Sequence, residues 1–330
     1  MTTRRELVTA LGAMALASPL SSFAQRASKV WRIGFLWGDE YSAFGPQPRF
    51  DAFKAGMSVL GYAHGRDYVI EQRSAQSDVA RLPALATELV ALKVDIIVSQ
   101  GTPAAVAASK ATREIPILMA VAGDPVGTGL AASLARPGGN VTGFTNLASE
   151  LVTKRLDLLR QILPRMRRVG LLYDPNSQIN AQSLTRFESD CAKLQLQPIY
   201  APARKAEEIA AAFKMLARNK AQGLIVPSGS TNNTSRKSII EHAAKHHLPA
   251  AYSQSNWPEA GGLFSYGADD TDLYRRAAAY ADKIFKGAKP GELPIQQPTL
   301  FDFVLNMKTA KALGLKIPGS ILVQATRVIE

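Results

Sequence analysis

Residues 32–37 read RIGFLW, and residues 168–173 read RVGLLY. Each stretch is an almost unbroken apolar run, which is typical of a parallel strand that is covered on both faces. The near identity of these two strands, one early in the chain and one near its middle, indicates that the chain contains two similar halves. We therefore expect an α/β protein built from two related lobes.

The order of the predicted elements repeats after each of these strands. In the first half we expect strands at 30–36, 68–74, 94–99, 115–121 and 141–144, with helices at 50–60, 79–92 and 103–111. In the second half we expect strands at 169–173, 198–201, 223–226 and 248–252, with helices at 181–194, 206–218 and 235–246. This alternation predicts two doubly wound parallel-sheet lobes. Any two doubly wound domains share this alternation of strands and helices, but the matching strand sequences favour a duplication.

The duplication predicts where a ligand binds. Right-handed crossovers place the carboxyl ends of the central strands at one edge of each sheet, and ligands bind beyond those ends. Two such edges that face each other form a cleft, which a hinge can close around a small molecule. We expect lobe 1 at residues 26–145, lobe 2 at 146–265, and a return segment at 266–330 that crosses the hinge and completes both lobes.

The first 25 residues differ from the rest of the chain. Arg4 and Arg5 precede the uncharged stretch LVTALGAMALASPL, and Ser22-Phe23-Ala24 carries small residues where a signal peptidase recognises its substrate. The apolar stretch is shorter than the about 20 residues that a membrane span needs. We interpret residues 1–25 as a secretory signal peptide without a lipid anchor, because no Cys lies near its end. The mature protein is expected to be periplasmic.

The composition fits a folded protein that does not bind nucleic acid. The 330 residues are 46% hydrophobic and 20% charged, and the formal net charge is +12. The basic residues are scattered along helices, and an exported chain does not meet the chromosome, so we predict no nucleic-acid partner. Cys191 is the only cysteine. It occupies an apolar helical position, which favours a buried thiol.

Polar residues follow several predicted strands of the first half. Thr102 follows a buried strand and precedes Pro103, so it can cap a helix whose N–H groups would attract a carboxylate. Asp124 ends the next strand, where it can bind a ligand ammonium or instead hold its own turn. Thr145 and Asn146 lie where the chain leaves the first lobe.

The second half offers equivalent positions. Asp174 ends the second copy of the first strand, Asn180 follows it, and Ser228 ends the strand GLIVP. Each of them could be a helix cap, but their shared place at the ligand edge favours binding. Trp37 and Tyr266 fall at the same edges and could form aromatic walls for a planar or cationic ligand, with core packing as the alternative for each.

The sequence gives little support for catalysis. His242 and His246 are four residues apart, which could place a metal pair on one helix face, but no HExxH motif or suitable carboxylate completes a site. A solvated helix end is the simpler interpretation of HAAKHH. No GxSxG elbow or paired-carboxylate motif occurs. We predict a protein that is not an enzyme and that has no cofactor and no metal.

Several strings together resemble one known family. They are RIGFLW, SQGTPAA, ILMAVAGDPVGTGLAASLARPGGNVTGFTN, GLLYDPNS, GGLFSYGAD and VLNMKTAKALGLKIP, and they span nearly the whole chain. They resemble the periplasmic substrate-binding proteins of ABC transporters, in the family that includes tryptophan- and tyrosine-binding members. The resemblance implies a type I periplasmic-binding-protein fold with three hinge crossings. It also implies a protein that binds a small solute and delivers it to an inner-membrane permease.

Carried over position by position, the resemblance implies a set of ligand contacts. They are Thr102, Ala104, Asp124, Thr145 and Asn146 from the first lobe, and Asp174, Asn180, Ser228 and Tyr266 from the second, with Trp37 beside them. For an amino acid or an aromatic acid, we expect Asp124 to bind an amine and the helix start at Thr102 to bind a carboxylate. We expect a monomer. Two alternatives stay open, an extracytoplasmic sensor for a membrane receptor and an exported α/β enzyme.

Overall fold

The computed structural model describes residues 29–38, 47–76 and 78–330, and the predicted signal peptide lies outside these ranges. The strands are β1 (Trp31–Trp37), β2 (Tyr68–Ser74), β3 (Ile96–Gln100), β4 (Ile117–Ala122), β5 (Val141–Thr145), β6 (Arg168–Tyr173), β7 (Gln197–Pro202), β8 (Gly223–Ile225), β9 (Ala250–Tyr252), β10 (Phe264–Ala268), β11 (Phe301–Asn306) and β12 (Arg327–Ile329).

The α-helices are α2 (Pro48–Val59), α3 (Leu82–Ala91), α4 (Thr102–Ala111), α5 (Leu151–Ile162), α6 (Gln178–Lys193), α7 (Ile209–Arg218), α8 (Ser230–Thr234), α9 (Arg236–Lys245), α10 (Asn256–Glu259), α11 (Asp270–Phe285), α12 (Met307–Ala312) and α13 (Gly319–Gln324). Short 3-10 helices are η1 (Val79–Arg81), η2 (Ala206–Glu208) and η3 (Pro290–Glu292). Among the described residues, no helix combines the length and apolar character that a membrane crossing requires.

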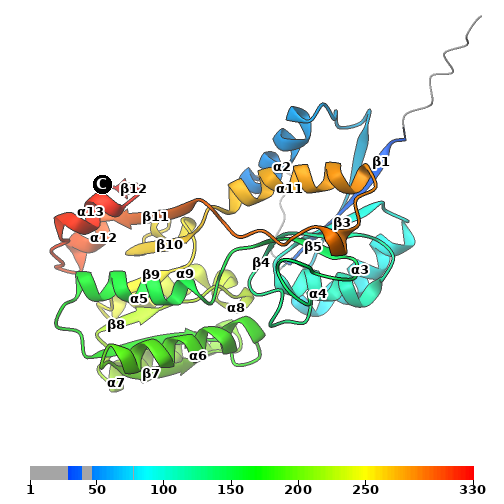
Figure 1. Ribbon diagram of the computed structural model, residues 1–330. Helices are drawn as coiled ribbons and strands as arrows, with labels where there is room; N and C mark the ends of the chain where they lie inside the picture. The colour runs from blue at the N-terminus through cyan, green and yellow to red at the C-terminus, as the bar shows by residue number, and fades with distance from the viewer. Residues whose placement is uncertain (1–28, 39–46, 77) are drawn as a thin grey trace, which may run out of the picture. The chain divides into compact units, whose positions relative to one another are not determined.

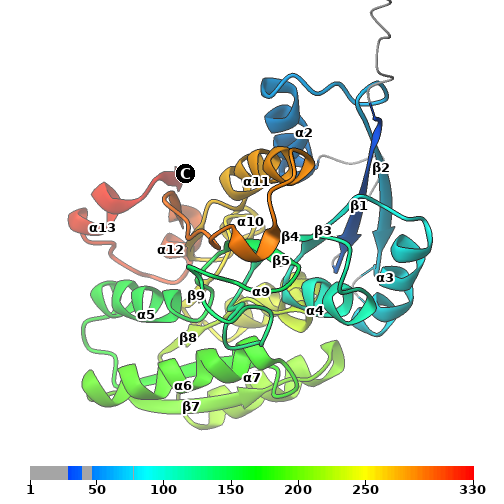
Figure 2. The ribbon, with the colours of Figure 1, turned by 45° about the vertical axis from the view of Figure 1, so that its right-hand side comes forward.

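The first lobe is built on a five-stranded parallel sheet with the order β2-β1-β3-β4-β5. One face packs against α2 and α11, where Phe35 of β1 meets Phe53 and Tyr274 in one apolar cluster. The other face packs against α3 and α4. Helices α2 and α11 lie side by side although they are far apart in the sequence (Figures 1 and 2). Gly56 permits this close approach, because a Cβ there would lie 2.6 Å from the carbonyl oxygen of Arg275.

The second lobe is built on a seven-stranded sheet with the order β12-β11-β10-β9-β8-β6-β7. Residues of α5 and α6 pack on one face, and residues of α7 and α9 pack on the other. The strands from β6 to β10 pair in parallel, as predicted, and β11, which comes from the return segment where no strand was predicted, runs antiparallel to β10. Cys191 is buried as predicted, and burial raises the pKa of its thiol to about 12.

The two sheets repeat the same strand order. Across the first sheet the strands lie in the order β2-β1-β3-β4-β5. Across the second sheet the corresponding order is β7-β6-β8-β9-β10, so in both sheets the second strand of the unit lies outside the first. The paired stretches that begin at Arg32 and Arg168 are therefore β1 and β6, which hold equivalent places. The predicted duplication of the α/β unit is confirmed.

The chain passes between the two sheets three times. It leaves the first sheet after β5, returns after β10 to form α11 against the first sheet, and crosses again before β11. The second and third crossings are joined where the Asp269 N–H donates to the Leu300 carbonyl at 3.0 Å. The first and third are joined where the Thr145 N–H donates to the Gln296 carbonyl at 2.9 Å. This bonded group of crossings is the hinge region.

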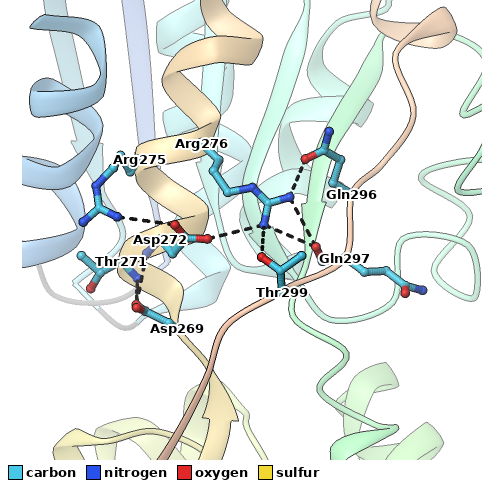
Figure 3. A network of polar contacts seen from close by, with 8 residues as sticks. All are labelled: Asp269, Thr271, Asp272, Arg275, Arg276, Gln296, Gln297 and Thr299. Atoms are coloured by element: carbon cyan, nitrogen blue, oxygen red, sulfur yellow. Dashed lines mark hydrogen bonds and ion pairs between the residues drawn. The ribbon is translucent and has the colours of Figure 1, made fainter. Parts of the chain in front are cut away.

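One arginine of α11 holds the hinge region together (Figure 3). The guanidinium of Arg276 donates to the side chain of Gln296 and reaches the Gln297 carbonyl and the Thr299 hydroxyl, each at 3.5 Å. It also lies 5.0 Å from the centre of the Phe144 ring on β5. Arg276 thus ties the helix that follows the second crossing to the first and third crossings.

Candidate ligand-binding site

A cavity of about 480 Å³ is lined by residues of both lobes. The first lobe contributes the end of β3 and the start of α4, and the second contributes the segments that follow β6 and β8. Gln254 and Asp270, next to the second crossing, also line it. The volume falls in the range of about 300–1,000 Å³ that small-molecule sites occupy. The cavity therefore lies where the sequence predicted a ligand, beyond the carboxyl ends of the strands.

The wall from the first lobe is held by hydrogen bonds to side chains. The Gly38 N–H donates to Oε1 of Gln100 at 3.1 Å, and the Gly123 N–H donates to Oγ1 of Thr102 at 2.9 Å. Thr102 lines the cavity, but it is the first residue of α4 and Gly101 takes the N-cap position, so the prediction that Thr102 caps this helix was wrong. Its hydroxyl instead fixes the end of β4 against the start of α4.

The wall from the second lobe depends on Asn180. Oδ1 of Asn180 accepts from the Asp174 N–H at 2.8 Å, and its Nδ2 donates to the Ser228 carbonyl at 2.7 Å. The Asp174 carboxylate accepts from the Asn176 N–H at 2.9 Å and from the Thr231 hydroxyl at 2.8 Å. Fully buried Asn180 thus joins the segment after β6 to the segment after β8, and Asp174 and Ser228 are left at the cavity surface.

Four of the ten predicted residues line the cavity; they are Thr102, Asn146, Asp174 and Ser228. Asn180 lies directly behind them. Thr145 also lies behind the wall, where its hydroxyl donates to the Gly123 carbonyl at 2.8 Å. Ala104 is fully buried in the core between α4 and the first sheet.

The remaining predicted residues have other contacts. Oδ1 of Asp124 accepts from the N–H groups of Val126 and Gly127 at 3.2 and 2.9 Å, so its carboxylate holds its own turn, which was the stated alternative. Trp37 packs in the first-lobe core and stacks on Phe35, with ring centroids 5.4 Å apart. Tyr266 stacks on Phe301 at the second sheet, with ring centroids 5.9 Å apart. The cavity lining includes none of these three predicted residues.

Sequence reasoning missed the charged residues Arg49, Arg204 and Asp270, which line the cavity. Nη1 of Arg49 lies 3.7 Å from Oδ2 of Asp270, and Nε2 of Gln254 donates to the same oxygen at 3.4 Å. Burial raises the pKa of the Asp270 carboxyl above its ordinary value, and nearby Asp269 and Asp302 act in the same direction while Arg49 opposes them. Asp270 is the second residue after β10, so the rule that ligands bind beyond the carboxyl ends of strands could have found it.

The two lobes also touch beside the cavity. Nε2 of Gln178 on α6 donates to the Gly127 carbonyl of the first lobe at 2.9 Å. A Cβ at Gly123 would lie 2.6 Å from Cδ1 of Ile179, so these positions are in close contact. Within the part of the chain that the structure describes, no group of three or more His, Cys, Asp or Glu side chains could hold a metal ion.

Two doubly wound lobes, three crossings and a cavity lined from both sides define a two-lobed binding protein with the type I periplasmic-binding-protein fold. Residues 47–329 match the family described as ABC transporter substrate binding protein. The chain belongs to this family, as the sequence resemblance implied.

Known relatives support this assignment. The tyrosine-binding protein of Clostridioides difficile strain R20291 is 29% identical over 276 residues, covering 82% of this chain and 78% of the relative. A crystal structure of an ABC domain from Streptococcus pneumonia in complex with L-Trp is 26% identical, with a TM-score of 0.84 over 91% of this chain and 100% of that chain. A ligand-free, open substrate-binding protein with adhesive properties from Clostridium difficile is 25% identical, with a TM-score of 0.68 over 91% and 99%.

Proposed function

We propose that this chain is the periplasmic component of an ABC importer, which closes its two lobes on an aromatic amino acid and delivers it to an inner-membrane permease. The observation that carries the proposal is the cavity of about 480 Å³ that both lobes line. A ligand shifts the balance between open and closed forms only when it binds one form better, and contact with both lobes at once provides this difference.

The comparisons support the choice of ligand. The relatives include a tyrosine-binding protein and a structure that holds L-Trp.

The arrangement of the lobes resembles that of the ligand-bound relative. At equal coverage of this chain, the TM-score is higher against the L-Trp complex than against the ligand-free, open protein, 0.84 against 0.68. The direct contacts of Gln178 and Ile179 with the first lobe agree with lobes that lie close together.

The test is isothermal titration calorimetry on the mature chain after unfolding and refolding, which removes any copurified ligand. The titrants are the twenty amino acids, with D-allose and benzoate as ligands that lack an amine. We expect binding of L-Trp or L-Tyr and none of the sugar. Absence of binding by every amino acid would refute the ligand class.

Delivery to a permease needs a separate experiment in cells. Deletion of the gene is expected to reduce uptake of the radiolabelled amino acid, and the full-length chain in trans is expected to restore it. Cell fractionation should recover the restored protein in the periplasm without residues 1–25. Normal uptake in the deletion strain, despite binding in vitro, would contradict the importer role and favour the sensor alternative.

A further inference from the structure

The cavity holds one carboxylate whose contacts within the protein are incomplete. Asp174 and Asp270 are the carboxylates among the lining residues that the structure describes. Both oxygens of Asp174 accept hydrogen bonds, one from the Asn176 N–H and one from the Thr231 hydroxyl. At Asp270 the ion pair with Arg49 and the hydrogen bond from Gln254 both fall on Oδ2. No described residue donates a hydrogen bond to the Oδ1 atom of Asp270.

The position of Asp270 in its helix leaves this carboxylate available. Asp270 is the first residue of α11, and a capping carboxylate belongs to the residue before the helix. That role is already taken by Asp269, whose Oδ1 accepts from the N–H groups of Thr271 and Asp272 at 2.9 and 3.1 Å (Figure 3). Asp270 is therefore not needed to start the helix.

The contacts that Asp270 does make are weak for a buried charge. Its side chain is 15% exposed, and its ion pair and hydrogen bond are long, at 3.7 and 3.4 Å. A buried carboxylate is costly unless it is paired and hydrogen-bonded. A cationic group that enters the cavity can supply the missing donors, and an ammonium group has three N–H donors to offer.

We propose that Asp270 receives the ammonium group of the bound ligand, while Arg49 and Gln254 hold its carboxylate in place through Oδ2. The inference rests on the proposed amino-acid-binding function and adds the residue that makes the site require an amine. It assigns to Asp270 the role that was predicted for Asp124, whose carboxylate holds its own turn.

The test compares two ligands on two variants by calorimetry. The ligands are L-Trp and indole-3-propionate, which has the same ring and carboxylate but no amine. The variants are Asp270→Asn and the control Asp51→Asn, an exposed carboxylate on α2 that pairs with Lys54. Wild type and the control should bind L-Trp far better than indole-3-propionate. In Asp270→Asn, L-Trp should bind about 30-fold more weakly or worse, because one partner of a buried charge pair is lost.

The outcomes separate this inference from the proposed function. L-Trp binding by Asp270→Asn within about threefold of wild type would overturn the role of Asp270 and leave the function standing. If no amino acid binds the wild type, both the role of Asp270 and the proposed function are refuted. The affinities of the wild-type protein for the two ligands test the inference even if the variant does not fold. Equal affinity for L-Trp and indole-3-propionate overturns the inference, and a strong preference for L-Trp supports it.

Discussion

Gly170 lies where a leucine of α7 reaches the surface of the second sheet. A Cβ at Gly170 would lie 2.3 Å from Cδ2 of Leu216, whereas a Cβ at the equivalent Gly34 would lie 3.1 Å from the nearest atom of Leu89. The glycine that both copies of the strand share is thus explained by a helix side chain that packs directly on the backbone.

We predict that Gly170→Ala lowers the free energy of unfolding by about 1–3 kcal/mol, because Leu216 must leave its position in a packed core. Gly34→Ala should cost less, since Leu89 needs to move only slightly. Urea unfolding of both variants measures the difference. A larger loss at Gly34 would contradict the packing described for the two strands.

Asp270 makes the stability of the ligand-free protein depend on pH. Because burial raises the pKa of this carboxyl in the folded state, the folded protein holds the proton more tightly than the unfolded chain does. The resulting stabilisation is present below the ordinary carboxyl pKa and is lost as the pH rises through the folded pKa. Above the folded pKa, the ionised carboxylate of Asp270 therefore lowers stability.

We predict that Asp270→Asn without ligand melts at a higher temperature than wild type at neutral pH. The difference in melting temperature between the variant and wild type should become smaller as the pH falls below the folded pKa of Asp270. Thermal unfolding monitored by circular dichroism at pH values from about 3 to 8 measures this difference, because that pH range spans the ordinary carboxyl pKa. A variant that is less stable than wild type at pH 7, by an amount that does not change with pH, would contradict the prediction. A residue retained for binding at the expense of stability fits the proposed site.

At the level of elements, the hinge region depends on Arg276 of α11. Its guanidinium contacts Gln296, Gln297 and Thr299 of the third crossing, and its neighbour Arg275 reaches only Asp272 among the residues in Figure 3. The two arginines are adjacent and equally charged, so they form a matched pair for testing which contacts hold the crossing.

We predict that Arg276→Met destabilises the protein by about 1–3 kcal/mol, because the charged hydrogen bond to the partly buried Gln296 side chain is lost. Arg275→Met should change stability by less than about 1 kcal/mol, as for exposed ion pairs. Hydrogen exchange should quicken at the amides of Ile295 and Gln296, which bond to the first lobe. Equal effects of the two substitutions would contradict the role given to Arg276.

Most elements of the two repeated units were predictable, because buried strands and amphipathic helices leave clear patterns. The strand at 68–74 was predicted with the bounds that the structure shows, and most others differ by one to three residues at an end. Helix α5 was not predicted, although Leu156 and Leu159 face the core from it. No copy of this helix precedes β1 in the described residues, so the repeat contains no pattern that predicts it.

The site was less predictable than the fold, because a residue's place in a loop does not determine where its side chain points. Asp124 and Asp270 both follow a strand and both could bind a ligand. The Asp124 carboxylate bends back to the N–H of Gly127, and only the folded backbone shows this. Arg204 and Arg49 reach the cavity from segments without any motif, so their role depends on tertiary packing.

For the whole molecule, the repeat is the feature that the sequence states most clearly and that the structure confirms. Two sheets with the same strand order present their carboxyl ends to one cavity, which explains why the chain contains the same strand twice. The exact division at residues 145 and 265 stays a prediction. Strand β10 continues to Ala268 in the second sheet before the chain crosses.

The most direct test of the account is small-angle X-ray scattering from the ligand-stripped chain without residues 1–25, measured before and after saturation with the amino acid that calorimetry identifies. The account predicts that the radius of gyration falls when the ligand binds, because contacts to both walls of the cavity draw the lobes together. A bound ligand that leaves the scattering profile unchanged would contradict the claim that this protein works by closing two lobes on its solute.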